Sequence, residues 1–415
     1  MSHRASDLIA PFVLWKLLLL AVALSCPGPG YDTSTGILHG SSEAAGLARK
    51  AAMRLTRWDA LYFSTTAARG HLYEQEWAFS WLLSRFVSSL SQALPITQDL
   101  LIQNALIGSL VACVSHALAV ATIYKATIAL LYFLPLHHRK QLAYATAVFH
   151  IFSPAGIILM APYGEAPFAL LQFVGMYCYV RAVKARVASK ADAVYWTILT
   201  GICFALSATI RSNGVLSGLI FVWDLVEALA LGEVREVLAT GVAGTILAIG
   251  FAFPQVIAFY EFCTDSTPRP WCSAVPPSIY TFVQREYWDV GFLRYWKLSN
   301  LPLFALALPM AWVLTTTAWP ALVQPRRFAR RLTNSNQSDH KAFDIILRRF
   351  AVPQLVLVLL ALTSFHCQII NRISSGYPLW YFCLAISQQD RWHLRAMITY
   401  ALVHAGLYAA FMPPA

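Results

Sequence analysis

Long apolar stretches separated by short polar segments dominate the hydropathy pattern of this chain of 415 residues. A helix that spans a bilayer needs about 20 predominantly apolar residues, and many of these stretches approach that length. They lie near residues 8–25, 101–123, 141–160, 166–182, 193–210, 213–231, 237–260, 300–321, 350–370, 377–389 and 396–412. The pattern predicts about eleven membrane spans, of which 377–389 could be re-entrant.

The composition supports the same prediction. Hydrophobic residues make up 58% of the chain and charged residues 12%, whereas soluble domains contain roughly 45–50% apolar and about 25% charged residues. We therefore expect one all-α polytopic membrane domain over 1–415. No CxxC, HExxH, P-loop or GxGxxG motif occurs in the sequence. No sequence motif therefore supports metal binding, nucleotide binding or hydride transfer. We expect no cofactor, and the sequence leaves a metal requirement open.

Lysine and arginine gather in alternate loops, which by the positive-inside rule face the cytoplasm. These cations are Arg139, Lys140, Arg181, Lys184, Arg186, Lys190, Arg326, Arg327, Arg330, Arg331, Lys341, Arg348, Arg349, Arg391 and Arg395. Membrane topology thus explains the net charge of +11, and it makes 324–349 a cytoplasmic loop. The opposite, exoplasmic or lumenal side receives the loops 27–100 and 261–298 and the turns at 163–165, 211–213 and around Arg372.

Three local features depend on this topology. The first apolar run follows His3 and Arg4 and is either an anchor or a cleaved signal peptide, and both deliver the loop after it to the lumen. The glycosylation sequon at 336–338 lies in the cytoplasmic loop, so we expect it to carry no glycan. Cys263 and Cys272 share one lumenal loop and could form a local disulfide.

The first lumenal loop contains the stretch "RWDALYFSTTAARGHLYEQEWAFSW", which carries five formal charges within an apolar chain. The segment 44–70 is predicted to form an amphipathic helix along the lumenal leaflet, with Leu47, Ala51 and Leu55 opposite Arg49, Lys50, Arg54 and Arg57. That helix would bring Asp59 to the membrane surface, where a carboxylate can meet a polar acceptor and a lipid-borne donor. For the aromatic residues of the loop, anchoring at the membrane interface is the alternative interpretation.

Six sequence blocks from about residue 55 to about residue 385 resemble the GPI mannosyltransferase 2 (PIG-V) family and follow in that family's order. The blocks are "RWDALYF", "GHLYEQEWAFSW", "SPAGIILMAPYGEAPFA", "ATIRSNG", "YTFVQREYWDVGFLRYW" and "NRISSGYPLWYF". The Trp-Asp block with its acidic and aromatic continuation is the most specific of them. Where the family usually has Glu-His-Asn-Phe-Ala-Phe-Phe-Pro, this chain has "EQEWAFSW", so Gln75 replaces the histidine and the proline is missing.

The resemblance implies a glycosyltransferase of the GT-C type in the endoplasmic reticulum membrane, with its active site on the lumenal side. It implies transfer of the second mannose, in α-1,6 linkage, from dolichyl phosphate mannose to the mannosylated glucosaminyl-phosphatidylinositol precursor of GPI anchors. It also implies, for fungal members, a small accessory membrane subunit. Nucleic acid has no place in this prediction.

The chemistry of such a transfer can be matched to residues. A β-linked mannosyl phosphate already carries a good leaving group, so direct displacement with inversion needs one base for the acceptor hydroxyl and cations for the departing phosphate. Asp59 is the predicted base. Arg211, Arg372 and Arg57 are candidates for the phosphate, and ordinary snorkelling cations at helix ends are the alternative.

The remaining candidate residues are assigned to substrate binding. Asn213 is a possible sugar ligand, and Glu165 is either a partner of a sugar hydroxyl or a neighbour of a helix N-cap. The "EQEWAFSW" block is a predicted wall of the acceptor site, and a second platform comes from the loop 261–298. The substrate-binding set therefore consists of Arg57, Trp58, Glu74, Gln75, Glu76, Tyr163, Glu165, Arg211, Asn213, Gln284, Trp288 and Arg372.

Two other functions remain open from sequence. One is a different transferase of the same architecture that uses a dolichyl-phosphate sugar and acts on protein or on N-glycan precursors. The other is a lipid scramblase or transporter, which should carry charged or helix-breaking residues at mid-depth in the bilayer. The predicted gathering of the polar motifs at one membrane face favours the transferase.

Overall fold

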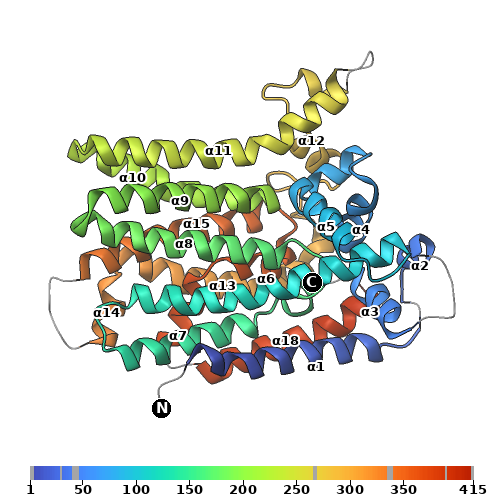
Figure 1. The fold of residues 1–415 in the computed structure, drawn as a ribbon, viewed down its shortest axis with the longest axis horizontal. Helices are drawn as coiled ribbons and strands as arrows, with labels where there is room; N and C mark the ends of the chain where they lie inside the picture. The colour runs from blue at the N-terminus through green and yellow to red at the C-terminus, as the bar shows by residue number, and fades with distance from the viewer. Residues whose placement is uncertain are drawn as a thin grey trace.

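The computed structural model describes residues 4–28, 30–39, 46–264, 269–333, 340–387 and 390–412. Within these ranges every regular element is a helix, and the long helices run side by side as one bundle (Figure 1). The all-α class expected from the apolar stretches is confirmed. The sequon at 336–338 lies outside the described residues.

Eight helical segments in the described ranges are long and apolar enough to cross a membrane. In the order α1, α6, α8, α9, α10, α11, α13 and α15, with short flanking 3-10 turns included, they are Ala5–Ser25, Leu100–Leu130, Glu165–Ala188, Lys190–Ile210, Ser212–Leu231, Val234–Cys263, Leu298–Val323 and Lys341–Thr363. Each overlaps one of the predicted apolar stretches, and the last begins at Lys341, nine residues before the predicted stretch 350–370. Such a set of parallel apolar helices makes this a multi-pass membrane protein.

The other three predicted spans correspond to α7 (Leu136–Ile151), α17 (Leu379–Ser387) and α18 (Asp390–Ala409). Helix α17 rises only about 14 Å at 1.5 Å per residue, against a hydrocarbon core of about 30 Å. Its residues from Leu379 to Ile386 are buried in protein, as expected for a re-entrant segment. The count of about eleven spans therefore stays a prediction.

The two ends of the bundle differ in character (Figure 1). One end, the loop end, carries the short helices α2 (Ser34–His39), α3 (Leu47–Leu55), α4 (Asp59–Arg69), α5 (Trp81–Ala93) and α12 (Ile279–Glu286). The opposite end, the basic end, carries α14 (Arg326–Leu332) with its four arginines. The loops that the sequence assigns to opposite membrane faces thus lie at opposite ends of the bundle.

The structure differs from the prediction of one amphipathic helix over 44–70. Instead of one helix over 44–70, the structure has α3 and α4, separated at Thr56 to Trp58. Arg54 and Arg57 are buried rather than turned toward lipid phosphates, whereas Leu47 is 70% exposed. The Arg54 guanidinium donates to the carbonyl oxygens of Cys26 and Ala409, which replaces the solvation that burial removes.

The N-terminal helix α1 packs into the bundle. Trp15 and Leu19 are buried, and the Lys16 Nζ donates to the Leu159 carbonyl oxygen at 2.9 Å. A buried ammonium with a fixed acceptor ties this helix to the turn between α7 and α8.

The local disulfide that Cys263 and Cys272 could form is present in the structure. It joins the last residue of α11 to the 3-10 turn η5 (Pro270–Ser273) at the loop end. Trp271 of that turn is buried beside Ile279 and Val283 of α12 and Trp77 of the first loop. The two loops 27–100 and 261–298 therefore share a small apolar core that holds them together.

Candidate active site

A cavity of about 190 Å³ opens at the loop end between segments that are far apart in the chain. Its walls come from α4, the turn before α5, the junction of α9 and α10, helix α12, and the short helix α16 (Ile370–Ile373). Six predicted site residues line it: Asp59, Arg211, Asn213, Gln284, Trp288 and Arg372. Folding thus brings residues from five of the six sequence blocks to one place.

A chain of alternating charges forms the polar side of this cavity. The Arg372 Nη2 lies 2.7 Å from the Asp59 Oδ2, and its Nε lies 3.5 Å from the Glu165 Oε1. The same Glu165 oxygen accepts from Arg211 Nη1 at 2.7 Å. Glu165 is fully buried, with 0% of its surface exposed. One hidden carboxylate therefore holds two arginines whose side chains line the cavity.

Asp59 is the first residue of α4, where the helix dipole favours a negative charge. The residue before it, Trp58, has φ 53° and ψ −124°. Residues other than glycine rarely adopt this backbone conformation. The Tyr163 hydroxyl donates to the Arg57 carbonyl oxygen at 3.0 Å, and the Tyr408 hydroxyl, 3.2 Å from the same oxygen, donates to the Leu55 carbonyl oxygen at 2.6 Å. These bonds hold the strained turn and so fix the start of α4.

The break between helices α9 and α10 sets the position of Arg211. Helix α9 ends at Ile210, and Arg211 is extended with φ −142°, so the chain leaves the helix axis at this residue. The following 3-10 turn folds back until a Cβ on Gly214 would lie 2.8 Å from the Ala208 nitrogen. Only glycine allows this close approach. The turn expected at 211–213 is therefore present, and it begins at Arg211.

The charge state of these groups follows from their partners. Burial lowers the pKa of Arg372, but the carboxylates of Asp59 and Glu165 outweigh this effect and raise it above its ordinary value. Burial raises the pKa of the Tyr163 phenol well above its ordinary value. At neutral pH Arg372 thus presents a charged guanidinium to the cavity, and the buried Tyr163 hydroxyl stays protonated.

Three predicted residues lie behind the cavity and not in its lining. Arg57 is 2% exposed, and its guanidinium lies 4.7 Å from the centroid of the Phe411 ring. The Trp58 indole packs edge-on against the same ring, and the Tyr163 ring packs beside Phe63. Burial, followed by the neighbouring Arg54, lowers the pKa of Arg57 to about 10. These three residues shape the turn that presents Asp59.

The acidic block separates into two halves. Ala78, Phe79 and Ser80 line the cavity, whereas Glu74, Gln75 and Glu76 do not. Glu74 accepts from the Trp271 Nε1 at 2.9 Å and from the Tyr287 hydroxyl at 3.4 Å. Because both donors belong to the other loop, Glu74 joins the two loops of the loop end.

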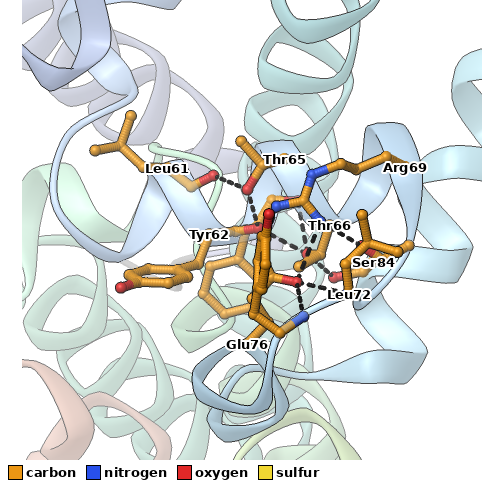
Figure 2. Close-up of polar contacts among 11 residues, drawn as sticks. Leu61, Tyr62, Thr65, Thr66, Arg69, Leu72, Glu76 and Ser84 are labelled. Carbon is orange, nitrogen blue, oxygen red and sulfur yellow. Dashed lines mark hydrogen bonds and ion pairs between the residues drawn. The ribbon is translucent and has the colours of Figure 1, made fainter. Parts of the chain in front are cut away.

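Glu76 closes the turn that follows α4. Figure 2 shows its carboxylate facing Arg69, with Nη2 to Oε1 at 2.6 Å and Nη1 to Oε2 at 3.2 Å. The Leu72 and Tyr73 amides also donate to its Oε2, at 2.8 and 3.1 Å. Burial opposes ionisation, yet Arg69 and these amides lower the pKa of Glu76 below its ordinary value. Both carboxylate oxygens thus have internal partners.

Replacing Glu76 with alanine is expected to lower the stability of the loop end by about 2 kcal/mol, because buried hydrogen bonds to a charge are lost. The measurement is the thermal melting of the purified protein in detergent. Glu286→Ala is the matched control, since that glutamate is exposed and its ion pair in the described part of the chain is with its neighbour Arg285. Equal melting temperatures for the two variants would contradict the role given to Glu76.

The sequence prediction missed several cavity residues. Ser212 and Tyr280 face the cavity and share a hydrogen bond of 2.6 Å between their hydroxyls. His366 also lines it, and a ring nitrogen lies 2.8 Å from the Trp288 carbonyl oxygen. Tyr280 is the first residue of the block "YTFVQREYWDVGFLRYW", so its place in a family motif could have indicated it. Nothing in the spacing around His366 indicates a site.

No cluster of three or more His, Cys, Asp or Glu side chains suited to a metal ion occurs among the described residues. The charged groups of the cavity are one carboxylate and two guanidinium groups. This arrangement suits a substrate that carries its own anionic group beside a hydroxyl from which a proton must be removed.

A family model described as "Mannosyltransferase (PIG-V)" matches residues 33–415. The chain belongs to this family. The match covers every segment that lines the cavity, and it confirms the family indicated by the six blocks. It also confirms the prediction of a glycosyltransferase that uses mannose.

Curated relatives agree along the whole chain. "GPI mannosyltransferase 2" of Gibberella zeae is 37% identical, and the alignment covers 100% of this chain and 98% of that protein. The protein of the same name from Aspergillus fumigatus is 36% identical over 97% of this chain and 92% of its own length. The protein of that name from Yarrowia lipolytica is 31% identical, with complete coverage of both chains.

Among solved structures, the chain is similar to the Archaeoglobus fulgidus oligosaccharyltransferase, with a TM-score of 0.48, 14% identity and coverage of 96% of this chain and 52% of that one. It is also similar to ArnT from Cupriavidus metallidurans, with a TM-score of 0.38, 13% identity and coverage of 98% and 78%.

Proposed function

We propose that this mannosyltransferase adds the second mannose, in α-1,6 linkage, to the mannosylated glucosaminyl-phosphatidylinositol precursor of GPI anchors. The donor is dolichyl phosphate mannose, and the reaction takes place at the lumenal face of the endoplasmic reticulum membrane. The full-length similarity to proteins named GPI mannosyltransferase 2 supports the acceptor class. The observation that carries the proposal is the pairing of Asp59 with Arg372 inside a cavity at one end of a membrane bundle.

Asp59 acts as the base in this proposal. The acceptor hydroxyl oxygen attacks C1 of the mannose while the bond from C1 to the phosphate oxygen breaks, and the electron pair leaves with dolichyl phosphate. Asp59 takes the proton of the hydroxyl. Because the nucleophile enters opposite the leaving group, a β-linked donor gives an α-linked product. A single carboxylate is sufficient, since the phosphate needs no proton to depart.

Arg372 and Arg211 stabilise the departing phosphate. Both guanidinium groups line the cavity, and the buried Glu165 fixes their position from behind. A phosphate that takes over Arg372 leaves the Asp59 oxygen, now 2.7 Å from that arginine, open to the acceptor hydroxyl. Donor binding and activation of the base are thereby coupled through one side chain.

The acceptor is bound by the outer wall of the cavity. Trp288 and Phe79 pack edge to face with ring centroids 5.7 Å apart, and Gln284 lies on the same wall. Aromatic faces with neighbouring amides suit the apolar and hydroxyl faces of a sugar. Asn213, held by the Tyr377 hydroxyl at 3.3 Å, supplies a further polar group.

The proposal is tested in microsomes from cells depleted of this protein. We expect the one-mannose precursor to accumulate, and added wild-type protein with labelled dolichyl phosphate mannose to convert it to the two-mannose species. Labelled mannose that appears on protein or on N-glycan precursors would favour the second transferase hypothesis instead. An unchanged two-mannose pool after depletion would contradict the proposed reaction.

A further inference from the structure

A second cavity, of about 960 Å³, lies at the basic end of the bundle, opposite the candidate active site. It is formed by α10, the end of α13, helix α14 and the start of α15. Six cations and two carboxylates line it. The cations are Arg326, Arg327, Arg330, Lys341, Arg348 and Arg349, and the carboxylates are Glu227 and Asp344.

Internal ion pairs account for only part of this positive charge. Arg326 lies 3.3 Å from Asp344, and the buried Arg349 pairs with Glu227 and, at 2.6 Å, with Asp224 behind the cavity. The other four cations of the lining have no carboxylate partner among the described residues. Among the described residues, six cations of the cavity lining thus stand against two carboxylates.

The placement of these cations is unfavourable without an anion. Arg327 and Arg330 are three residues apart on α14 and therefore neighbours on the helix surface, where their like charges repel each other. Lys341 and Arg348 are two turns apart, on one face of α15. The positive-inside rule explains why many cations lie at this end. It does not explain why cations from two helices converge on one concave surface.

The position of the cavity indicates its occupant. It lies near the end of α10, the end of α13 and the start of α15, three helices long and apolar enough to cross a membrane, and Trp223, Val323 and Ile345 add apolar surface among the cations. Guanidinium groups bind phosphate through paired, charge-assisted hydrogen bonds, and basic pockets between membrane helices are suited to anionic headgroups. We propose that this cavity binds the phosphate headgroup of a net-anionic phospholipid from the adjoining leaflet.

Lipid binding by the purified full-length protein tests this proposal. Native mass spectrometry in a neutral detergent measures the binding of dioctanoyl phosphatidylglycerol and of dioctanoyl phosphatidylcholine. The variant Arg330→Gln/Arg348→Gln removes two of the unpaired cations. Lys190→Gln/Arg235→Gln is the matched control, because it removes two exposed cations at the same end but outside the cavity.

We expect the wild type and the control to bind the anionic lipid alike, and the Arg330→Gln/Arg348→Gln variant to bind it roughly tenfold more weakly. Added salt should reduce the difference, since the attraction is electrostatic. If the double variant does not remain monodisperse, Arg330→Gln alone is expected to weaken binding about threefold.

Equal binding by the two double variants would overturn the proposal, and so would equal binding of the zwitterionic lipid. Displacement of the anionic lipid by an equal concentration of inorganic phosphate would also overturn it, because the site would then bind a soluble anion. Mannose transfer is expected to be the same in all variants. The outcome is thus independent of the proposed enzyme reaction.

Discussion

Replacing Asp59 with asparagine is expected to slow mannose transfer by roughly a thousandfold, within the range that a general base contributes to catalysis. The amide keeps the size of the side chain and its place at the start of α4, but it cannot take the proton from the acceptor hydroxyl. The measurement is the initial rate of formation of the two-mannose precursor in microsomes, with the amount of each variant protein determined in parallel.

Asp289→Asn is the matched control for this experiment. Asp289 is also a carboxylate at the loop end, paired with Lys297 at 2.6 Å, but it is half exposed and does not line the cavity. We expect its variant to retain the wild-type rate. The result that would remove Asp59 from the mechanism is an equal rate for the two variants at equal protein amounts.

Asp59→Glu separates charge from position. This variant keeps the carboxylate and the attraction to Arg372 but moves the oxygens by one methylene group. Because a displacement of about 1 Å can cost a factor of 10² in rate, a low rate for this variant too would mean that the exact placement of the base matters. That placement depends on the strained Trp58 backbone and the two tyrosine hydroxyls behind it.

The fold could be predicted from sequence because apolar run length is a local property. Each of the eight long apolar helices matches a predicted stretch. The number of spans could not be predicted in the same way, because Leu379–Ser387 is as apolar as a span and only its length and burial within the bundle set it apart. An apolar sequence shows that a segment is shielded from water, but it does not distinguish shielding by protein from shielding by lipid.

The candidate site was predictable only in part, for a similar reason. Arg372 and Arg211 could be placed at one membrane face from sequence, since both follow or interrupt apolar stretches. Their shared contact with Glu165 could not, because it joins three segments that are distant in the chain. The amphipathic pattern around Arg54 and Arg57 was misleading, since these arginines are solvated by carbonyl oxygens and an aromatic ring instead of by lipid phosphates.

Glu165 and Asp224 invite a direct comparison. Each is a buried carboxylate that pairs with two arginines: Arg211 and Arg372 at the loop end, and Arg186 and Arg349 at the basic end. Removing one member of a buried ion pair destabilises a protein by roughly 3–5 kcal/mol. Glu165→Gln and Asp224→Asn should therefore lower the melting temperature by similar amounts.

Their kinetic effects should differ. In Glu165→Gln the two arginines lose their common carboxylate, so we expect the KM for dolichyl phosphate mannose to rise about tenfold or more, because two charge-assisted contacts to the phosphate lose their geometry. Asp224→Asn should leave this KM unchanged for the protein that remains folded.

Glu165→Asp keeps the carboxylate and should restore part of the donor affinity that Glu165→Gln loses. If both neutral variants lose activity only in proportion to the amount of folded protein, Glu165 stabilises the bundle and has no part in positioning the arginines. A selective change in donor KM is a readout that destabilisation alone would not produce.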